Sequence, residues 1–129
     1  LAALEVGDLV KAEDAYKRFL ARMPSNPYAK LGLAHTQLQL RILNLDPAQT
    51  IAAANSAPLE IESALAAADM EVATGSVEPA FIRLLALVKE TSGDDRARVK
   101  DRLLELFSLV DPADPRVIKA RAELANALF

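Results

Sequence analysis

The sequence has no cysteine and only one histidine, His35, in its 129 residues. The missing cysteines exclude disulfide bonds, thiol catalysis and thiolate metal ligands within this chain. A single histidine excludes any metal cluster built from several histidines. No motif links His35 to a serine or threonine nucleophile, so we expect a partly buried packing residue rather than a catalytic base. These absences predict a domain without enzymatic activity, cofactor or metal.

Aromatic residues and long hydrophobic runs are also scarce. No apolar run approaches the roughly 18–20 residues of a membrane span, and no signal-peptide pattern opens the chain. The net charge of −3 argues against nucleic acid as the main partner. We therefore expect a cytoplasmic protein that binds neither membrane nor nucleic acid.

What the sequence does have is helix-forming residues. Alanine and leucine, with 25 and 21 copies, fill 46 of the 129 positions. Valine, isoleucine and threonine together supply only 17 residues, and aromatic residues only 5%. This balance disfavours a β-sheet and predicts an all-α fold.

Helix starts are marked at regular intervals along the chain. Asparagine or aspartate directly precedes proline at Asn26, Asp46 and Asp114, where the side chain can cap a helix whose first position tolerates proline. Further starts are expected after Gly7 and Gly75, near Ser56 and Pro58, and at Gly93. The predicted array has about seven to eight antiparallel helices: a segment before Gly7, then 8–22, 26–44, 47–56, 58–74, 76–91, 94–110 and 114–128.

One predicted helix carries a clear apolar stripe. Residues 94–110 place five apolar side chains at helical spacing: Val99, Leu103, Leu106, Phe107 and Val110. We expect this stripe to be core. In the same region, acidic residues stand three or four positions from Arg98 and Arg102, a spacing typical of surface ion pairs.

The chain contains an internal repeat. The segment from Gly7 to Ala12 is similar to that from Gly75 to Ala80, 68 residues later, which is two periods of about 34 residues. With two helices in each period, the sequence resembles the tetratricopeptide repeat (TPR) family. Gly7, Ala12, Tyr16 and Pro24 match its repeat positions, and the following units are degenerate. The resemblance implies an array of antiparallel helical hairpins, an α-α superhelix.

The C-terminal third carries a closer resemblance. The segments 98–107, 114–115 and 121–128 are similar to the end of bacterial thioredoxin-like co-chaperones of the YbbN (chaperedoxin) type. The resemblance implies that residues 1–129 form a single TPR-like domain that follows a thioredoxin-like domain. We therefore expect a fragment of a longer protein. Arg121 matches an arginine of that family, and we expect a structural role, such as pairing with an acid of the preceding helix.

The resemblance implies a protein–protein interaction domain that binds partly unfolded clients or a chaperone partner. One alternative is a substrate-recruiting domain of a thioredoxin-type oxidoreductase in cell redox homeostasis, which a Cys-x-x-Cys motif in the upstream domain would favour. Another is a plain TPR oligomerisation scaffold. The sequence does not distinguish these possibilities.

A binding groove is predicted from the TPR register, in which the first helix of each unit lines the concave face. Two sets of residues follow one helix face each, at spacings of three and four positions. Together they form an apolar groove with an acidic rim: Tyr28, Leu31, His35, Leu38, Glu62, Leu65, Asp69 and Val72. The alternative is that the leucines and Val72 pack against a neighbouring helix. Gly32, within the same helix, predicts close helix packing.

The charges are unevenly distributed. Residues 42–82 contain six acids and no lysine or arginine. They predict either a solvated acidic face or an acidic patch that steers a basic or partly unfolded client.

The N-terminal stretch before Gly7 is too short to be a complete TPR helix. We expect it to be the tail of a truncated first helix. The next helix would then keep apolar surface uncovered, and the chain would be a monomer or a weak homo-oligomer through this end.

Overall fold

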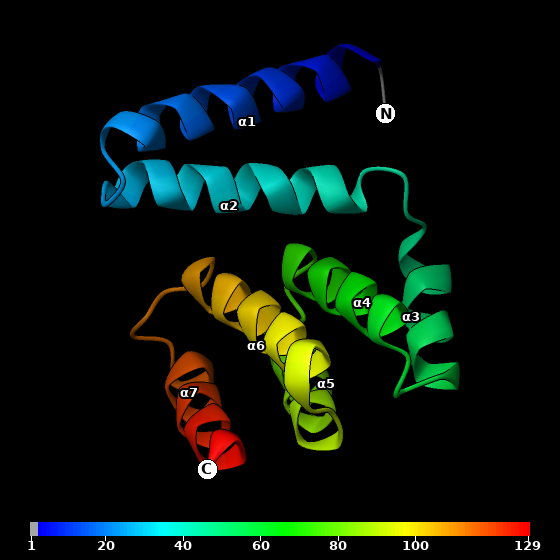
Figure 1. Cartoon of the computed structure of the whole chain (residues 1–129). Coiled ribbons are helices and arrows are strands. Elements are labelled where there is room, and N and C mark those ends of the chain that lie inside the picture. Colours follow the sequence, from blue (N-terminus) through cyan, green and yellow to red (C-terminus); the bar gives the residue numbers. More distant parts are fainter. Residues whose placement is uncertain (1–2) are drawn as a thin grey trace. The chain divides into compact units, whose positions relative to one another are not determined.

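The computed structural model describes residues 3–129, with side chains from residue 6 onward, and this part of the chain consists of seven helices without a strand (Figure 1). The predicted all-α fold is therefore confirmed. The helices form two compact units, residues 1–44 and 45–129, which are described separately.

The first unit is a hairpin of α1 (Ala3–Arg22) and α2 (Pro27–Ile42). Asn26 caps α2 as its sequence predicts, because its side-chain oxygen accepts a hydrogen bond from the Ala29 backbone N–H at 3.0 Å. The Tyr16 ring of α1 lies against Gly32, where an added Cβ would stand 2.5 Å from the tyrosine Cε1. The prediction that Gly32 permits close helix packing is thereby confirmed.

The expected helix break at Gly7 is wrong, because α1 runs through this glycine without interruption. Gly75, its supposed counterpart, has a φ of +90° and ends a helix, whereas Gly7 does not have positive φ. A glycine inside a helix costs only about 1 kcal/mol, and helix-forming neighbours offset that cost. The prediction of a separate, truncated helix before Gly7 is therefore wrong, because Ala3 to Val6 belong to α1. Leu1 and Ala2 lie outside the described residues.

The second unit consists of α3 (Pro47–Ser56), α4 (Ile61–Ala73), α5 (Val77–Glu90), α6 (Gly93–Ser108) and α7 (Pro115–Leu128). Consecutive helices from α3 to α6 contact each other, α4 also contacts α6, and α5 also contacts α7. These contacts are those of successive antiparallel helix pairs, α3–α4, α4–α5 and α5–α6, with α7 packed on α5. The arrangement confirms the predicted array of helical hairpins within this unit (Figure 1).

The start of α4 differs from its prediction. The helix begins at Ile61 rather than Pro58, because Glu60 provides the cap. The Glu60 carboxylate accepts hydrogen bonds from the backbone N–H groups of Glu62 at 3.2 Å and Ser63 at 2.6 Å. Hydrogen bonds with Ser63, first from its side chain and then from its backbone N–H, lower the pKa of Glu60. The preceding residues form a turn, in which the Glu60 N–H donates to the Ala57 carbonyl.

The core of the second unit lies among α4, α5, α6 and α7. Val99, Leu103, Leu106 and Phe107 are all buried, as the apolar stripe predicts, while Val110 is half-buried. The Phe107 ring meets Phe81 of α5 edge to face, with 4.9 Å between ring centroids. Arg121 of α7 covers the same ring at 5.1 Å, so its observed contact is aromatic rather than the expected ion pair with α6.

Candidate functional site: an apolar trough along α5

The α2 half of the predicted groove is mostly open to solvent. Tyr28 is 84% exposed and Leu31 41% exposed, and His35 is also exposed, whereas Leu38 is buried. The expectation that His35 is partly buried is wrong. Three of these four side chains are therefore accessible to a partner on one face of α2.

The α4 half of the predicted groove is largely internal to its unit. Leu65 and Asp69 are each 2% exposed, Val72 is half-buried, and only Glu62 is exposed. Leu65 thus follows the alternative interpretation, in which it packs against neighbouring helices. Because the α2 and α4 sets belong to separate units, their combination into one groove stays a prediction.

Asp69 and Glu62 of α4 are both paired with arginines of α6. Arg102 Nη1 donates to Asp69 Oδ2 at 2.7 Å, and its Nε lies 3.6 Å from Glu105 Oε2. Arg98 pairs with Glu62, and this contact lowers the pKa of the Glu62 carboxyl. Arg102 thus forms the predicted pair with Glu105 along its own helix, and both arginines also connect α6 to α4.

Glu71 of α4 forms a largely buried ion pair with Arg83 of α5. Its two carboxylate oxygens accept from Arg83 of α5 at 2.9 and 3.3 Å, and Arg83 also donates to Asn55 of α3 at 3.0 Å. The side chain of Glu71 is 6% exposed and that of Arg83 is 15% exposed. One guanidinium thus joins three consecutive helices of the unit.

Most acids of the stretch 42–82 have a partner in the folded chain. Three of its acids are neutralised by arginines from α5 and α6, as described above. Two others cap helices: Glu60 caps α4, and Asp46 caps α3 by accepting from the Gln49 N–H at 2.8 Å. Four of the six acids, Asp46, Glu60, Glu62 and Glu78, are exposed, as the solvated face predicts, whereas Asp69 and Glu71 are buried. The steering patch stays a prediction. Glu78 lies at the edge of a cavity.

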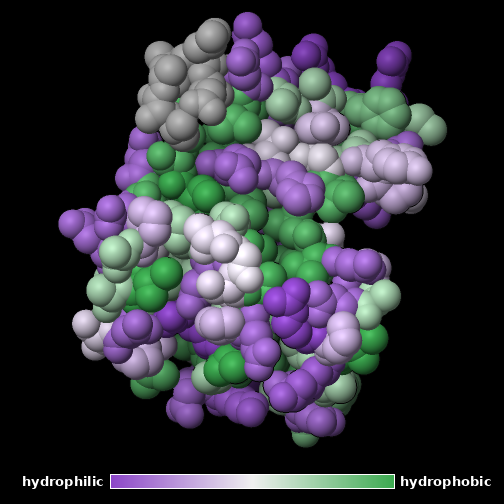
Figure 2. Space-filling model, turned by 180° about the vertical axis from the view of Figure 1, so that it is seen from behind, coloured by the Kyte–Doolittle hydropathy of each residue, from purple (hydrophilic) through white to green (hydrophobic). Residues whose placement is uncertain are grey.

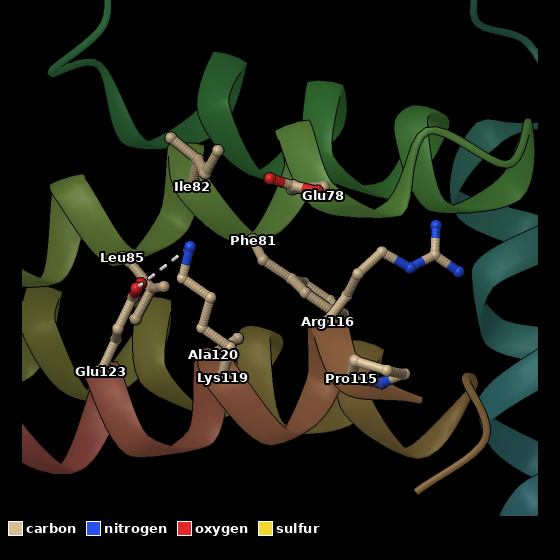
Figure 3. Close-up of a pocket in the computed structure, with 9 residues that line it drawn as sticks. All are labelled: Glu78, Phe81, Ile82, Leu85, Pro115, Arg116, Lys119, Ala120 and Glu123. Carbon is tan, nitrogen blue, oxygen red and sulfur yellow. Dashed lines mark ion pairs between the residues drawn. The ribbon is translucent and has the colours of Figure 1, made fainter. Parts of the chain in front are cut away.

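That cavity lies between α5 and α7 and has a volume of about 210 Å³. Figure 3 shows Phe81 and Leu85 pointing from α5 toward α7, where Pro115 and Ala120 complete the apolar lining. Ile82 also lines it and is 58% exposed. The cavity is therefore an open apolar surface depression.

A second cavity of about 550 Å³ continues the first along α5 and shares Ile82, Leu85 and Glu123 with it. Its added apolar residues are Ala86 and Leu59, and Leu59, from the loop before α4, is 63% exposed. We call the two cavities together the α5 trough. Its floor is Ile82, Leu85 and Ala86, and its walls are Leu59 on one side and Ala120 on the other.

The charged residues that α7 contributes to the trough form ion pairs within α7 or at its start. Lys119 Nζ lies 4.0 Å from Glu123 Oε1, one helical turn away, as the dashed line in Figure 3 shows. Arg116 donates to both Asp114 oxygens, at 3.0 and 2.7 Å. This contact, with the Arg116 N–H, lowers the pKa of Asp114 to about 2.

The first unit has an apolar depression of its own. A cavity of about 440 Å³ lies at the turn between α1 and α2 and is lined by Tyr16, Phe19 and Tyr28, among others. Phe19 is 44% exposed, and Met23 nearby in sequence is 52% exposed. Figure 2 shows hydrophobic residues open to solvent between hydrophilic ones on the face that it presents. Exposed apolar side chains thus occur in both units.

The side chains from residue 6 to residue 129 include no group of three or more histidines or acids that could hold a metal ion. None of the helices described is long and apolar enough to cross a bilayer. The expectation that the chain is not an enzyme stays a prediction.

Comparison with known proteins places this geometry in context. A tetratricopeptide repeat family matches residues 43–129, nearly the same range as the second unit. Uncharacterized proteins of Mycobacterium tuberculosis and Mycobacterium bovis are 43% identical over 126 residues, which is 98% of this chain. The chain spans only 41% of the length of these relatives. No solved structure matches.

Proposed function

Because the chain belongs to the tetratricopeptide repeat family, we propose that it is the protein-binding domain of a thioredoxin-like co-chaperone. In this function it holds partly unfolded clients or docks onto a chaperone partner. TPR arrays are interaction scaffolds, since stacked helix pairs create extended surfaces for other proteins. The family gives the general function, and the co-chaperone assignment is the proposal.

The observation that carries the proposal is the α5 trough. Leu59 and Ile82, two large aliphatic side chains, are each more than half exposed beside an apolar floor. Exposed apolar surface is costly in water, and a contiguous patch typically marks a protein-binding site. An unfolded client offers the apolar segments that such a surface can cover.

Two further observations support the co-chaperone assignment. The segments 98–107 and 121–128 resemble the end of the YbbN-type family, and the mycobacterial relatives extend well beyond the matched region. The additional length of those relatives is sufficient for another domain, such as a thioredoxin-like one. We further propose that the present domain acts without catalysis or cofactor, in the cytoplasm, and away from membranes and nucleic acid.

The holding activity is tested with a model client that aggregates on heating, followed by light scattering with and without an equimolar amount of the 129-residue chain. We expect the chain to reduce the final scattering in proportion to its concentration. A soluble helical protein of similar size and charge serves as the control. Scattering that is the same with both proteins would contradict the proposal.

The oxidoreductase alternative is tested on the full-length mycobacterial relative with an insulin-reduction assay in the presence of dithiothreitol. The co-chaperone proposal predicts suppression of client aggregation whether or not insulin is reduced. Insulin reduction without any suppression of aggregation would favour the substrate-recruiting domain instead. Light scattering of the 129-residue chain alone distinguishes the oligomerisation scaffold, which would appear as a stable oligomer.

A further inference from the structure

The α5 trough has an apolar floor with charged residues around it. Ile82, Leu85 and Ala86 occupy the floor over little more than one turn of α5. Glu78 and Lys89 stand at its two ends, and Glu123 of α7 lines both cavities. The α5 positions follow the spacing of one helix face. Eleven residues separate the two charged ends, which corresponds to about 16 Å along a helix.

The charges beside the trough are balanced in number. Three acids, Glu78, Glu90 and Glu123, and three bases, Lys89, Arg116 and Lys119, line it. Lys119 pairs with Glu123, and Arg116 pairs with Asp114 outside the trough. Since acids and bases are equal in number, the lining presents no excess of either sign. The complementary partner is therefore uncharged where it fills the trough.

The length of the trough sets how many residues of a bound segment it holds, in an extended or in a helical conformation. An extended chain rises about 3.3 Å per residue, so about five residues span 16 Å. A helix would need about eleven residues, of which only one face could enter the trough. Short uncharged apolar segments of that length are buried in folded proteins and become exposed when a protein unfolds.

We propose that the α5 trough binds an extended, uncharged apolar segment of about five residues from an unfolded protein. The proposal rests on the proposed client-holding function and names the class of segment that the domain recognises. Leu59 and Ile82 contact the apolar side chains of the segment, and the balanced edge charges exclude segments that carry charge in the same place.

The test uses three fluorescently labelled peptides with the full 129-residue chain, and binding is followed by fluorescence anisotropy. All three have the same length and serine–glycine flanks. The first has five uncharged apolar residues at its centre. In the second, two of these five are replaced by lysine, and in the third by glutamate. We expect the uncharged peptide to bind at least about tenfold more tightly than either charged peptide. Its affinity should change little with salt, because charges that are balanced in number leave little for salt to screen.

Matched variants locate the binding surface. Ile82→Glu places a charge in the trough, whereas Ile118→Glu places one on α7 at a residue of nearly equal exposure, 57%, that lines neither cavity. We expect Ile82→Glu to weaken the binding of the uncharged peptide by about tenfold or more, equivalent to about 1.4 kcal/mol. Ile118→Glu should leave the affinity unchanged. Leu59→Glu should behave like Ile82→Glu. Circular dichroism confirms that each variant is folded.

Four results would overturn the inference. These are equal weakening by Ile82→Glu and Ile118→Glu, tighter binding of a charged peptide, no binding of any peptide, or a dimer that Ile82→Glu dissociates and that excludes the peptide. If the chain still suppresses client aggregation in any of these cases, the proposed function stands and only the assignment to the trough fails. If aggregation is not suppressed either, both fail.

Discussion

Arg83 is the residue on which the packing of three helices depends. It donates to Glu71 and to Asn55, and both Arg83 and Glu71 are largely removed from water. The attraction between such charges mostly repays their desolvation, so a buried pair adds little net stability while intact. Removal of one partner leaves the other charge buried and uncompensated.

We therefore expect Glu71→Leu to lower the free energy of unfolding by about 3–5 kcal/mol, measured by urea denaturation. The double variant Glu71→Leu/Arg83→Met should recover a large part of the loss, because neither charge then remains. The control is Arg18→Ala, which removes the exposed pair with Asp14 and should cost less than about 1 kcal/mol. If the double variant is less stable than Glu71→Leu, the pair contributes net stability and this argument is wrong.

Phe107 is the largest side chain of the apolar stripe that the sequence predicts to be core. The ring is 1% exposed and contacts both Phe81 and Arg121. Phe107→Ala should cost about 3–5 kcal/mol, since it removes the buried ring and leaves a cavity. Phe129→Ala, at a fully exposed phenylalanine, serves as the control and should be neutral. A Phe107→Ala protein as stable as the control would mean that the stripe on α6 is not core.

Asp114 couples the stability of the chain to pH. It caps α7 and pairs with Arg116, and its pKa is about 2 in the folded chain against the ordinary value of 3.8. The unfolded chain therefore takes up the proton first as pH falls. The contribution is complete above pH 3.8 and is lost as pH decreases toward about 2.

Asp114→Asn should flatten the pH dependence of stability in this interval. Asparagine keeps the capping oxygen but cannot titrate. We therefore expect the free energy of unfolding near neutral pH to change little, while its decrease between pH 3.8 and 2 becomes smaller. The measurement is the unfolding midpoint in urea at a series of pH values from 2 to 7. An unchanged slope between pH 3.8 and 2 would show that other carboxyls control the acid transition.

At the scale of helices, the two glycines of the first hairpin have opposite roles. An added Cβ at Gly7 meets no atom within 4 Å, whereas one at Gly32 would lie 2.7 Å from the Tyr16 hydroxyl oxygen. Alanine favours a helix over glycine by about 1 kcal/mol at either position. At Gly32 this gain is opposed by displacement of the tyrosine ring.

We expect Gly7→Ala to raise the melting temperature and Gly32→Ala to be less stable than Gly7→Ala by about 1–3 kcal/mol. Both variants are measured by thermal unfolding with circular dichroism. In a Tyr16→Ala background, Gly32→Ala should become neutral or stabilising, because the ring that it displaces is gone. A Gly32→Ala variant as stable as Gly7→Ala in the wild-type background would exclude a tight contact.

Helix starts could be predicted wherever the local chemistry is decisive. Asn26, Asp46 and Asp114 each cap the helix that their sequence predicts, because an acceptor followed by proline suits a helix start and little else. Gly7 and Pro58 misled the prediction for a shared reason. Glycine and proline permit a helix boundary without requiring one, and the decision depends on neighbours such as the Glu60 cap.

The binding surface could be predicted only in part. The periodicity placed Tyr28, Leu31 and His35 on one exposed face, but it could not show that Leu65 and Asp69 turn inward. Asp69 is buried because Arg102, 33 residues away, pairs with it, and no local pattern encodes that partner. The α5 trough was missed for a similar reason, since it depends on Leu59 and Ala120, which come from different parts of the chain.

At the scale of the whole chain, two independent observations divide it at nearly the same place. The compact units meet at residues 44 and 45, and the tetratricopeptide repeat family matches from residue 43 onward. The largest fully buried side chains, including Phe81, Leu84 and Phe107, all belong to the second unit. The hairpin 1–44 has only two helices with which to bury apolar surface. The second unit therefore has a core of its own, and the hairpin has little.

This division predicts different behaviour for the two segments when they are produced separately. Residues 45–129 should remain helical and unfold cooperatively, because the segment contains both partners of the pairs Glu71–Arg83, Asp69–Arg102 and Phe81–Phe107. Residues 1–44 should be largely unfolded at 25 °C, since chains near 40 residues rarely bury enough surface to fold alone. Circular dichroism melts of both segments and the whole chain provide the measurement. Phe107→Ala should lower the melting temperature of 45–129 as it does that of the whole chain. If 45–129 shows no cooperative transition, its core is incomplete without the hairpin.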